Sequence, residues 1–353
     1  MNKEIYVIKI GSNVLLGENG IDEEIINNLA LKVSKLKNNG IKVVLVSSGA
    51  VAMGKKKMGT NTIKGLTKDE CGQIFSSIGQ TRLMDTYTRY FDKYDIIISQ
   101  ALLTRRDFSD RERYNSIKKV LFTSLELGIV PIINENDVLS VEELDFSDND
   151  ELGALLAAMI GADKLIILSN INGLYDSFPN GNLIKKVEKI DKSILSMVGV
   201  DKSSMGKGGM ESKLKTAKMM MDLGIKMYIA NGKNKDTIEK IYNNSNPGTV
   251  FESIEEKKVD SLRKWLKAGA VPTGKLQVST IIADLLKSGK RASLLEIGVE
   301  KVEKEFVKGD VVGVFDMEGC CIGYGIAKID SNEIDKYSEE RKIVIHTNYF
   351  INI

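Results

Sequence analysis

The sequence predicts an α/β protein with a mainly parallel sheet, followed by a small domain rich in strands. Apolar runs of strand length alternate with amphipathic helical patterns through residues 1–253, which is typical of a parallel sheet. Only 4 of the 353 residues are proline, which suits regular elements. From residue 275 the apolar runs become short and glycines separate them. We therefore expect domains at 1–253 and 275–353, joined by a linker at 254–274.

The elements of the first domain are expected in regular order. The expected strands are Ile5–Ile10, Lys42–Ser47, Asp95–Leu103, Gly128–Ile133, Lys164–Leu168 and Lys226–Ala230. The expected helices are Asp22–Asn38, Asp69–Phe91, Asp110–Leu127, Glu151–Ile160, Met210–Leu223 and Asp236–Asn243. In the first of these helices, Ile25, Leu29 and Val33 recur at helical spacing. A hairpin is expected around Ser177–Leu183, and a helix at Ser279–Leu286 belongs to the second domain.

Composition excludes several classes of protein. The net charge is only +2, so the chain as a whole has no strong attraction for nucleic acid. No apolar run approaches the roughly 20 residues that span a bilayer, and no secretory segment opens the chain, so we expect a cytoplasmic protein with no membrane contact. Three cysteines (Cys71, Cys320 and Cys321) and the single His346 do not support a disulfide framework, a zinc site or a histidine-based triad. We therefore expect no structural metal.

Polar residues cluster after one of the buried strands. The strand at Gly128–Ile133 leads directly into Asn134–Asp137, and a second cluster, Ser147–Asp150, precedes the next helix. Ligands of open α/β sheets bind beyond the carboxyl ends of strands and at helix N-termini, so we interpret these clusters as half of an active site. The alternative is that Asp148 or Asn149 only caps the helix.

Two glycine-containing turns also follow strands. In the first, Lys9 stands near a strand end and Gly11 lets backbone amides approach an anion, although Lys9 could instead be solvated. In the second, Gly49–Lys55 fits the G-x-x-x-x-G-K part of a P-loop. Lys56 stands where that motif needs Ser or Thr for magnesium, so the P-loop pattern fails. What remains is a turn whose amides can bind phosphate or carboxylate, or a purely structural turn.

A third turn, Met205–Lys213, opens the helix at Met210–Leu223. It places Lys207 and Lys213 at a helix N-terminus, where a cation opposes the helix dipole by roughly 0.3–1 kcal/mol. This arrangement favours an anion bound between the two lysines over the alternative of exposed lysines beside flexible glycines.

Together these patterns predict phosphoryl transfer without a P-loop. Lysines and backbone amides would neutralise the phosphate oxygens, with magnesium bridging them. A carboxylate acceptor, with a pKa of about 4, is already ionised at neutral pH and needs no histidine base. Asp150 could hold the two lysines in place through charged hydrogen bonds.

Eight motifs in order carry a family resemblance. They are VIKIGSNVL (Val7–Leu15), VSSGAVAMG (Val46–Gly54), SIGQTRLM (Ser77–Met84), LLTRRDFSDRERY (Leu102–Tyr114), PIINENDVLS (Pro131–Ser140), FSDNDELGALLA (Phe146–Ala157), NGLYDSFP (Asn172–Pro179) and MGKGGMESK (Met205–Lys213). Through them the chain resembles the glutamate 5-kinases (γ-glutamyl kinases) of the amino acid kinase family along essentially its full length. Residues Arg291–Val312 resemble part of a PUA domain.

The resemblance implies a three-layer αβα sandwich (the amino acid kinase fold) with a C-terminal PUA-like domain. It implies ATP-dependent phosphorylation of the γ-carboxylate of L-glutamate, the first step of proline biosynthesis, with Mg²⁺ and ATP. On matching positions the catalytic residues are Lys9, Lys213 and Asp150, and the glutamate-binding residues are Ser48, Asp137 and Asn149. The nucleotide-binding positions are Lys9, Ser169, Asn170, Lys207, Gly208, Gly209, Met210, Glu211, Ser212 and Lys213.

The resemblance also implies feedback inhibition by proline, a homodimer or homotetramer, and channelling of the product to glutamyl phosphate reductase. The chain departs from the family at Ser169-Asn170, where Thr-Asp is usual, and at Lys207, where threonine is usual. Both departures concern the nucleotide side. Ser147 replaces a usual glycine.

The sequence leaves two alternative functions open. One is a related kinase acting on N-acetylglutamate or aspartate, although the central loop and the PUA-like tail favour glutamate. The other is RNA binding through the tail. Three tail lysines alternate with three glutamates, which is typical of a solvated mixed face, so we expect no nucleic acid partner. They are Lys301, Lys304 and Lys308, with Glu300, Glu303 and Glu305. A tail that modulates activity or assembly is the preferred hypothesis.

Overall fold

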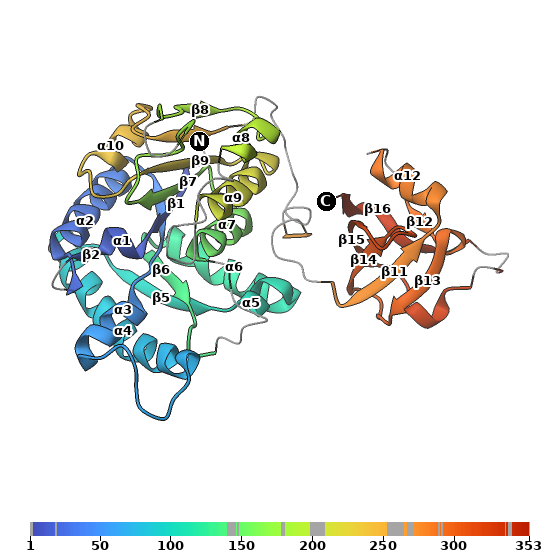
Figure 1. Cartoon of the computed structure of the whole chain (residues 1–353), viewed down its shortest axis with the longest axis horizontal. Helices are drawn as coiled ribbons and strands as arrows, with labels where there is room; N and C mark the ends of the chain where they lie inside the picture. Colours follow the sequence, from blue (N-terminus) through green and yellow to red (C-terminus); the bar gives the residue numbers. More distant parts are fainter. Residues whose placement is uncertain are drawn as a thin grey trace. The chain divides into compact units, whose positions relative to one another are not determined.

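The computed structural model describes residues 3–17, 20–139, 146, 148–177, 181–197, 209–252, 265–266, 272–288, 290, 292–335, 337 and 341–352. The chain forms two compact units, Met1–Lys258 and Val259–Ile353 (Figure 1). Most of the predicted linker at 254–274 lies outside the described residues. No helix among the described residues has both the length and the apolar character needed to cross a bilayer.

The first unit is built on an eight-stranded sheet with the order β5-β6-β4-β1-β7-β9-β10-β8. Its strands are β1 Ile5–Ile10, β4 Lys42–Val46, β5 Ile98–Leu103, β6 Val130–Glu135, β7 Lys164–Ser169, β8 Lys186–Val187, β9 Lys226–Asn231 and β10 Thr249–Phe251. All neighbouring pairs are parallel except β9 with β10. The parallel sheet predicted from the sequence is therefore confirmed, and β10 is an antiparallel addition that the sequence patterns did not indicate.

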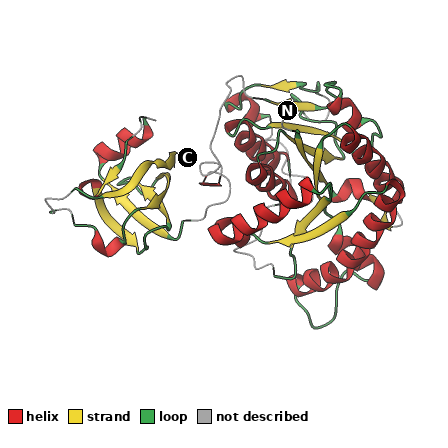
Figure 2. Ribbon diagram, turned by 180° about the vertical axis from the view of Figure 1, so that it is seen from behind, coloured by secondary structure: helices red, strands yellow, loops and turns green. Residues whose placement is uncertain are grey.

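Helices cover both faces of this sheet (Figures 1 and 2). One face is covered by α2 Glu23–Asn38, α4 Lys68–Phe91 and α10 Thr237–Tyr242, and the other by α6 Arg111–Glu126, α7 Asn149–Ile160 and α9 Met210–Asp222. Side chains of β1 alternate between the two layers, because Tyr6, Ile8 and Ile10 join the core formed with α2 and α4. Lys9 points to the opposite layer, where a Cβ placed on Gly153 of α7 would lie 3.5 Å from the Lys9 Cβ. The three-layer αβα sandwich is confirmed.

Two of the predicted helices begin at an aspartate that caps them. Asp22 caps α2 by accepting a hydrogen bond of 3.1 Å from the Glu24 N–H, and Asp110 caps α6 through the Glu112 N–H at 3.0 Å. Where the predicted hairpin lies, Tyr175 pairs antiparallel with Leu183. Further short elements are α1 Ser12–Leu15, β2 Leu16–Gly17, β3 Gly20–Ile21, α5 Arg105–Ser109, α8 Lys192–Ser196 and the 3₁₀ turn Asp92–Tyr94.

Helix α3 (Ala50–Met58) crosses α4 at backbone contact. A Cβ added to Gly54 would lie 1.8 Å from the Phe75 carbonyl oxygen, and one added to Gly79 would lie 1.8 Å from the Ala50 carbonyl oxygen. Glycine at both positions therefore lets the two helices touch without intervening side chains. The crossing fixes α4 against the turn where α3 begins.

The second unit contains a six-stranded sheet with the order β12-β16-β15-β14-β11-β13, against which a helix packs through Ala283 and Leu286. Its elements are β11 Gly274–Val278, α12 Thr280–Lys287, β12 Leu294–Leu295, β13 Val299–Lys304, β14 Val311–Phe315, β15 Cys321–Ala327, β16 Ile343–Asn352 and the 3₁₀ turns Glu296–Gly298 and Ser331–Glu333. It has its own apolar core around Leu276, Val312 and Val344. The predicted small β-rich domain is confirmed.

Candidate active site

The carboxyl ends of four parallel strands meet at one edge of the large sheet. Strands β1, β4, β6 and β7 deliver, in turn, Lys9–Gly11, Ser47–Gly49, Asn134–Asp137 and Ser169–Asn170 to this edge. Residues from all four segments line one cavity of about 460 Å³. The cavity lies where ligands of open α/β sheets bind.

A buried carboxylate joins two lysines at one wall of the cavity. Asp150, in the first turn of α7, is completely buried. Its Oδ1 lies 2.7 Å from the Lys9 Nζ, and its Oδ2 lies 3.0 Å from the Lys213 Nζ in the first turn of α9. Lys9 and Lys213 are each only 8% exposed, and both line the cavity. Lys9 is therefore paired rather than solvated.

The electrostatics of this triad favour an anion. Burial alone would raise the pKa of Asp150, but the attraction and hydrogen bonds of Lys9 and Lys213 outweigh burial and hold the pKa below its ordinary value. The carboxylate is therefore ionised at neutral pH. Two ammonium groups and one carboxylate leave one net positive charge beside the cavity. Phosphoryl oxygens are suitable partners for that charge.

Asn149 faces the strand ends from the start of α7. Its Nδ2 lies 2.7 Å from the Ser47 carbonyl oxygen, 2.9 Å from the Ser48 Oγ and 3.0 Å from the Asn134 Oδ1. The neighbouring Asp148 instead caps the helix, since its Oδ1 accepts hydrogen bonds from two backbone N–H groups of the first turn. The capping alternative thus holds for Asp148, whereas Asn149 turns toward the cavity.

Asp137 and Asn134 receive support from a helix that the sequence analysis did not connect to the site. The Ser76 Oγ donates a hydrogen bond of 2.6 Å to the Asp137 Oδ2, and the Asn134 Nδ2 donates one of 2.9 Å to the Gln80 Oε1. Ser76 and Gln80 belong to α4 and are both buried. The sequence signal that could have identified them is a pair of polar residues four positions apart in a predicted helix.

The structure describes some of the residues that were predicted to bind the nucleotide. Ser169 and Asn170 line the cavity, and the Ser169 Oγ donates to the Asn170 Oδ1 at 3.4 Å. Gly209 precedes α9, and the side chain of Glu211 forms an ion pair of 2.9 Å with Lys215. The predicted residues Gly209, Met210, Glu211 and Ser212 are not among the described residues that line the cavity. Lys207, Gly208 and Ser147 lie outside the described residues.

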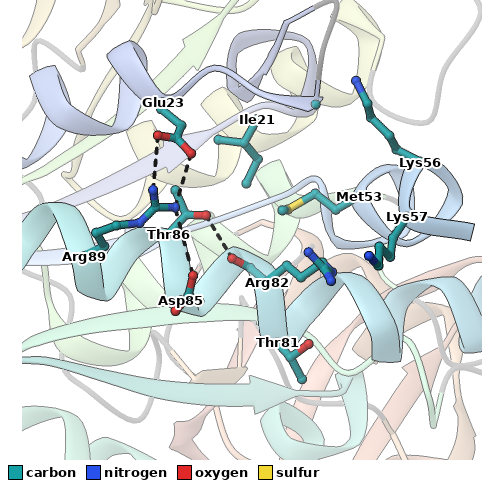
Figure 3. A pocket seen from close by; sticks show the side chains of 11 residues that line it. Ile21, Glu23, Met53, Lys56, Lys57, Thr81, Arg82, Asp85, Thr86 and Arg89 are labelled. Atoms are coloured by element: carbon teal, nitrogen blue, oxygen red, sulfur yellow. Dashed lines mark hydrogen bonds and ion pairs between the residues drawn. The ribbon is translucent and has the colours of Figure 1, made fainter.

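A larger hollow of about 800 Å³ lies along α3 and α4 (Figure 3). There Arg89 lies between Glu23 and Asp85 and pairs with them at 3.2 and 4.0 Å. The hollow contains none of the residues predicted for catalysis or substrate binding. The predicted catalytic residues Lys9 and Lys213 and the predicted glutamate-binding residues instead line the smaller cavity.

The sandwich and the triad define a kinase of the amino acid kinase type. The sequence model described as "Amino acid kinase family" matches residues 4–231, and that of the PUA domain matches residues 274–348. The chain therefore belongs to the amino acid kinase family and carries a C-terminal PUA domain, as the resemblance predicted.

Three curated relatives are called glutamate 5-kinase. The protein of Dehalococcoides mccartyi (strain CBDB1) is 37% identical, with 99% of this chain and 96% of the relative covered. "Glutamate 5-kinase 1" of Bacillus licheniformis is 38% identical, with both chains covered completely. The protein of Bacteroides thetaiotaomicron is 35% identical, with 97% of this chain and 96% of the relative covered.

The fold is also similar to a solved structure, carbamate kinase from Giardia lamblia bound to AMP-PNP. The TM-score is 0.52 at 18% identity, and the match covers 71% of this chain and 99% of that chain. This likeness supports the fold of the first unit.

Proposed function

We propose that this protein transfers the γ-phosphoryl group of ATP to the side-chain carboxylate of L-glutamate, the first step of proline biosynthesis. A carboxylate oxygen of glutamate attacks the γ-phosphorus, the bond from that phosphorus to the β-phosphate oxygen breaks, and L-glutamyl 5-phosphate and ADP form. The observation that carries the proposal is the Lys9–Asp150–Lys213 triad at the edge of the cavity. The names of relatives that cover 97–100% of the chain support glutamate as the acceptor.

Lys9 and Lys213 act on the transferring group. Their ammonium groups neutralise charge on its oxygens, which is where catalysis of phosphoryl transfer operates. Asp150 holds both lysines in one geometry without itself touching the reacting atoms. No general base is required, because the acceptor carboxylate is ionised at neutral pH.

Ser48, Asp137 and Asn149 hold glutamate. Asp137 lines the cavity and supplies a carboxylate for the substrate ammonium group. Ser48 and Asn149 also line it and can hydrogen-bond the substrate carboxylates without adding negative charge. The ammonium group and the carboxylates of glutamate would thereby each meet a complementary group of the protein.

ATP enters with magnesium on its phosphate oxygens, as is usual for phosphoryl transfer. Ser169 and Asn170 contact the nucleotide from β7, and the segment 207–213 contacts it from the start of α9. Residues 1–253 form the kinase domain and 275–353 the PUA-like domain. A homodimer or homotetramer, feedback inhibition by proline, channelling to glutamyl phosphate reductase and a cytoplasmic location complete the proposal, and all rest on the family resemblance.

The test is a trapping assay with the full-length protein, MgATP and L-glutamate. Hydroxylamine converts an acyl phosphate to a hydroxamate, so we expect hydroxamate and ADP in equal amounts, both dependent on glutamate. N-acetylglutamate and L-aspartate serve as alternative acceptors. ADP release without hydroxamate, or faster turnover with either alternative acceptor, would overturn the proposal.

A further inference from the structure

Helix α4 reaches the glutamate-binding side of the cavity with two buried polar side chains. Ser76 and Gln80 are 4% and 8% exposed and lie one helical turn apart on the same face. Ser76 bonds to Asp137 at 2.6 Å, and Gln80 bonds to Asn134 at 2.9 Å. One face of α4 therefore contacts both the Asn134 amide at the end of β6 and the Asp137 carboxylate in the loop that follows.

The Gln80 contact is one of three hydrogen bonds that orient the Asn134 amide. Because the Asn134 Nδ2 donates to Gln80, the Asn134 Oδ1 is turned toward the Asn149 Nδ2 at 3.0 Å and the Glu135 N–H at 2.9 Å. The same Asn149 nitrogen lies 2.9 Å from the Ser48 Oγ. Gln80 therefore contacts Asn134 directly, and it influences the positions of Asn149 and Ser48 through Asn134.

The α3–α4 crossing makes α4 a rigid support for this network. Gly79, between Ser76 and Gln80, lies against the backbone of Ala50, and no side chain separates them. Ala50 follows the turn Ser48–Gly49, where Gly49 has a φ of 100°. A shift of α4 would therefore move the Ser48 turn as well as Asp137 and Asn134.

Stability alone does not account for glutamine at position 80. Its Nε2 is buried and has no hydrogen-bond partner among the described residues. A buried donor without a partner lowers the stability of the folded protein. The contact with Asn134 is thus kept despite a penalty that an apolar side chain at this position would avoid.

We infer that Ser76 and Gln80 are positioning residues that hold Asp137 and the Asn134–Asn149 pair in the orientation that binds an α-amino dicarboxylate. This inference rests on the proposed function. Ser76 acts through Asp137 on the substrate ammonium group, and Gln80 acts through Asn134 and Asn149. Ser76 should therefore influence discrimination between L-glutamate and glutarate, which has the same two carboxylates but no ammonium group.

The experiment compares Ser76→Ala and Gln80→Met with two matched controls in the full-length chain. Ser77→Ala removes the adjacent, exposed hydroxyl of α4, which among the described residues bonds only to the Ile74 carbonyl oxygen. Gln100→Met changes an exposed glutamine of β5. For each protein we measure kcat, KM for glutamate and for ATP, the glutamate-to-glutarate ratio of kcat/KM, glutamate binding by calorimetry, and Tm.

We expect Ser76→Ala and Gln80→Met to raise the glutamate KM and Kd roughly ten-fold, the effect of losing one hydrogen bond to a charged or buried group. The ATP KM should stay near that of the controls for both variants. The Tm of Gln80→Met should also stay near that of its control, because this change exchanges one unpaired buried amide for another, that of Asn134. Ser76→Ala should also lower the glutamate-to-glutarate ratio. A purely structural role would instead lower Tm and change the two KM values together.

The outcomes separate the two proposals. If the wild-type protein phosphorylates glutamate and both variants keep the control values of glutamate KM and Kd, the positioning roles are wrong and the proposed function stands. If the wild-type protein neither binds nor phosphorylates glutamate, both are wrong.

Discussion

The Asp150 carboxylate lies 3.0 Å from the Lys213 ammonium group, although the two residues belong to different helices. Both occupy the first turn of their helix, and α7 and α9 begin at the same edge of the sheet. A carboxylate is favourable at a helix N-terminus and a lysine is not, so the pair offsets the unfavourable position of Lys213. Lys9 completes the arrangement from β1.

Replacing Lys213 by methionine should lower kcat by roughly 10²–10³-fold, because the ammonium group stabilises charge that is transferred in the transition state. The glutamate KM should change little, since the proposed function places glutamate at Ser48, Asp137 and Asn149. Lys215→Met is the matched control on the same helix, because Lys215 is exposed and pairs with Glu211. Steady-state ADP release checks the prediction, and equal activity of the two variants would contradict it.

Replacing Asp150 by asparagine should destabilise the protein in a pH-dependent way. At pH 7 the variant leaves two buried cations without their carboxylate, at a cost of about 3–5 kcal/mol. The pKa of Asp150 in the folded protein is lowered, so the stabilisation is complete above the ordinary value near 3.9 and is lost as pH falls through the lower folded value.

Urea unfolding from pH 3 to 7 measures this effect. The difference in unfolding free energy between wild type and Asp150→Asn should be constant from pH 7 to about 5 and should shrink below about pH 4. A difference that does not change with pH would contradict the ionised triad.

The helix crossing can be tested with a pair of glycines on α4. Gly79→Ala places a Cβ 1.8 Å from the Ala50 carbonyl oxygen, so it should cost roughly 1–3 kcal/mol or more and raise the glutamate KM by displacing the Ser48 turn. A Cβ on Gly72 meets no atom within 4 Å, so Gly72→Ala should stabilise by roughly 0.5–1 kcal/mol. Urea unfolding and glutamate kinetics should separate the two variants, and similar behaviour would refute the close crossing.

Asp137→Asn should weaken glutamate binding while leaving catalysis intact. The amide keeps the shape of the side chain and an oxygen that can accept from Ser76, but it lacks the charge that pairs with an ammonium group. We expect the glutamate KM to rise roughly 10- to 100-fold, with a much smaller change for glutarate. An unaltered glutamate KM in steady-state assays would remove Asp137 from the substrate site.

The sequence predicted most of the fold because its signals are local. The apolar run of β1 and the helical spacing in α2 each depend on residues that are close along the chain. The antiparallel strand β10 was not predicted from the sequence, because a strand of three residues is too short to show a recognisable pattern. The close approach of α3 to α4 was also not predicted, because the sequence does not show which backbone a helical glycine will contact.

For the site, the sequence by itself placed Lys9, Asp150 and Lys213 at strand ends and helix starts, and the family resemblance carried by its motifs predicted them together as catalytic residues. Only the tertiary structure decided that α4 contacts Asp137 and Asn134 through Ser76 and Gln80. The physical reason is that strand ends meet wherever a parallel sheet forms, whereas a contact from a packed helix depends on how closely that helix approaches. Here that approach depends on Gly54 and Gly79.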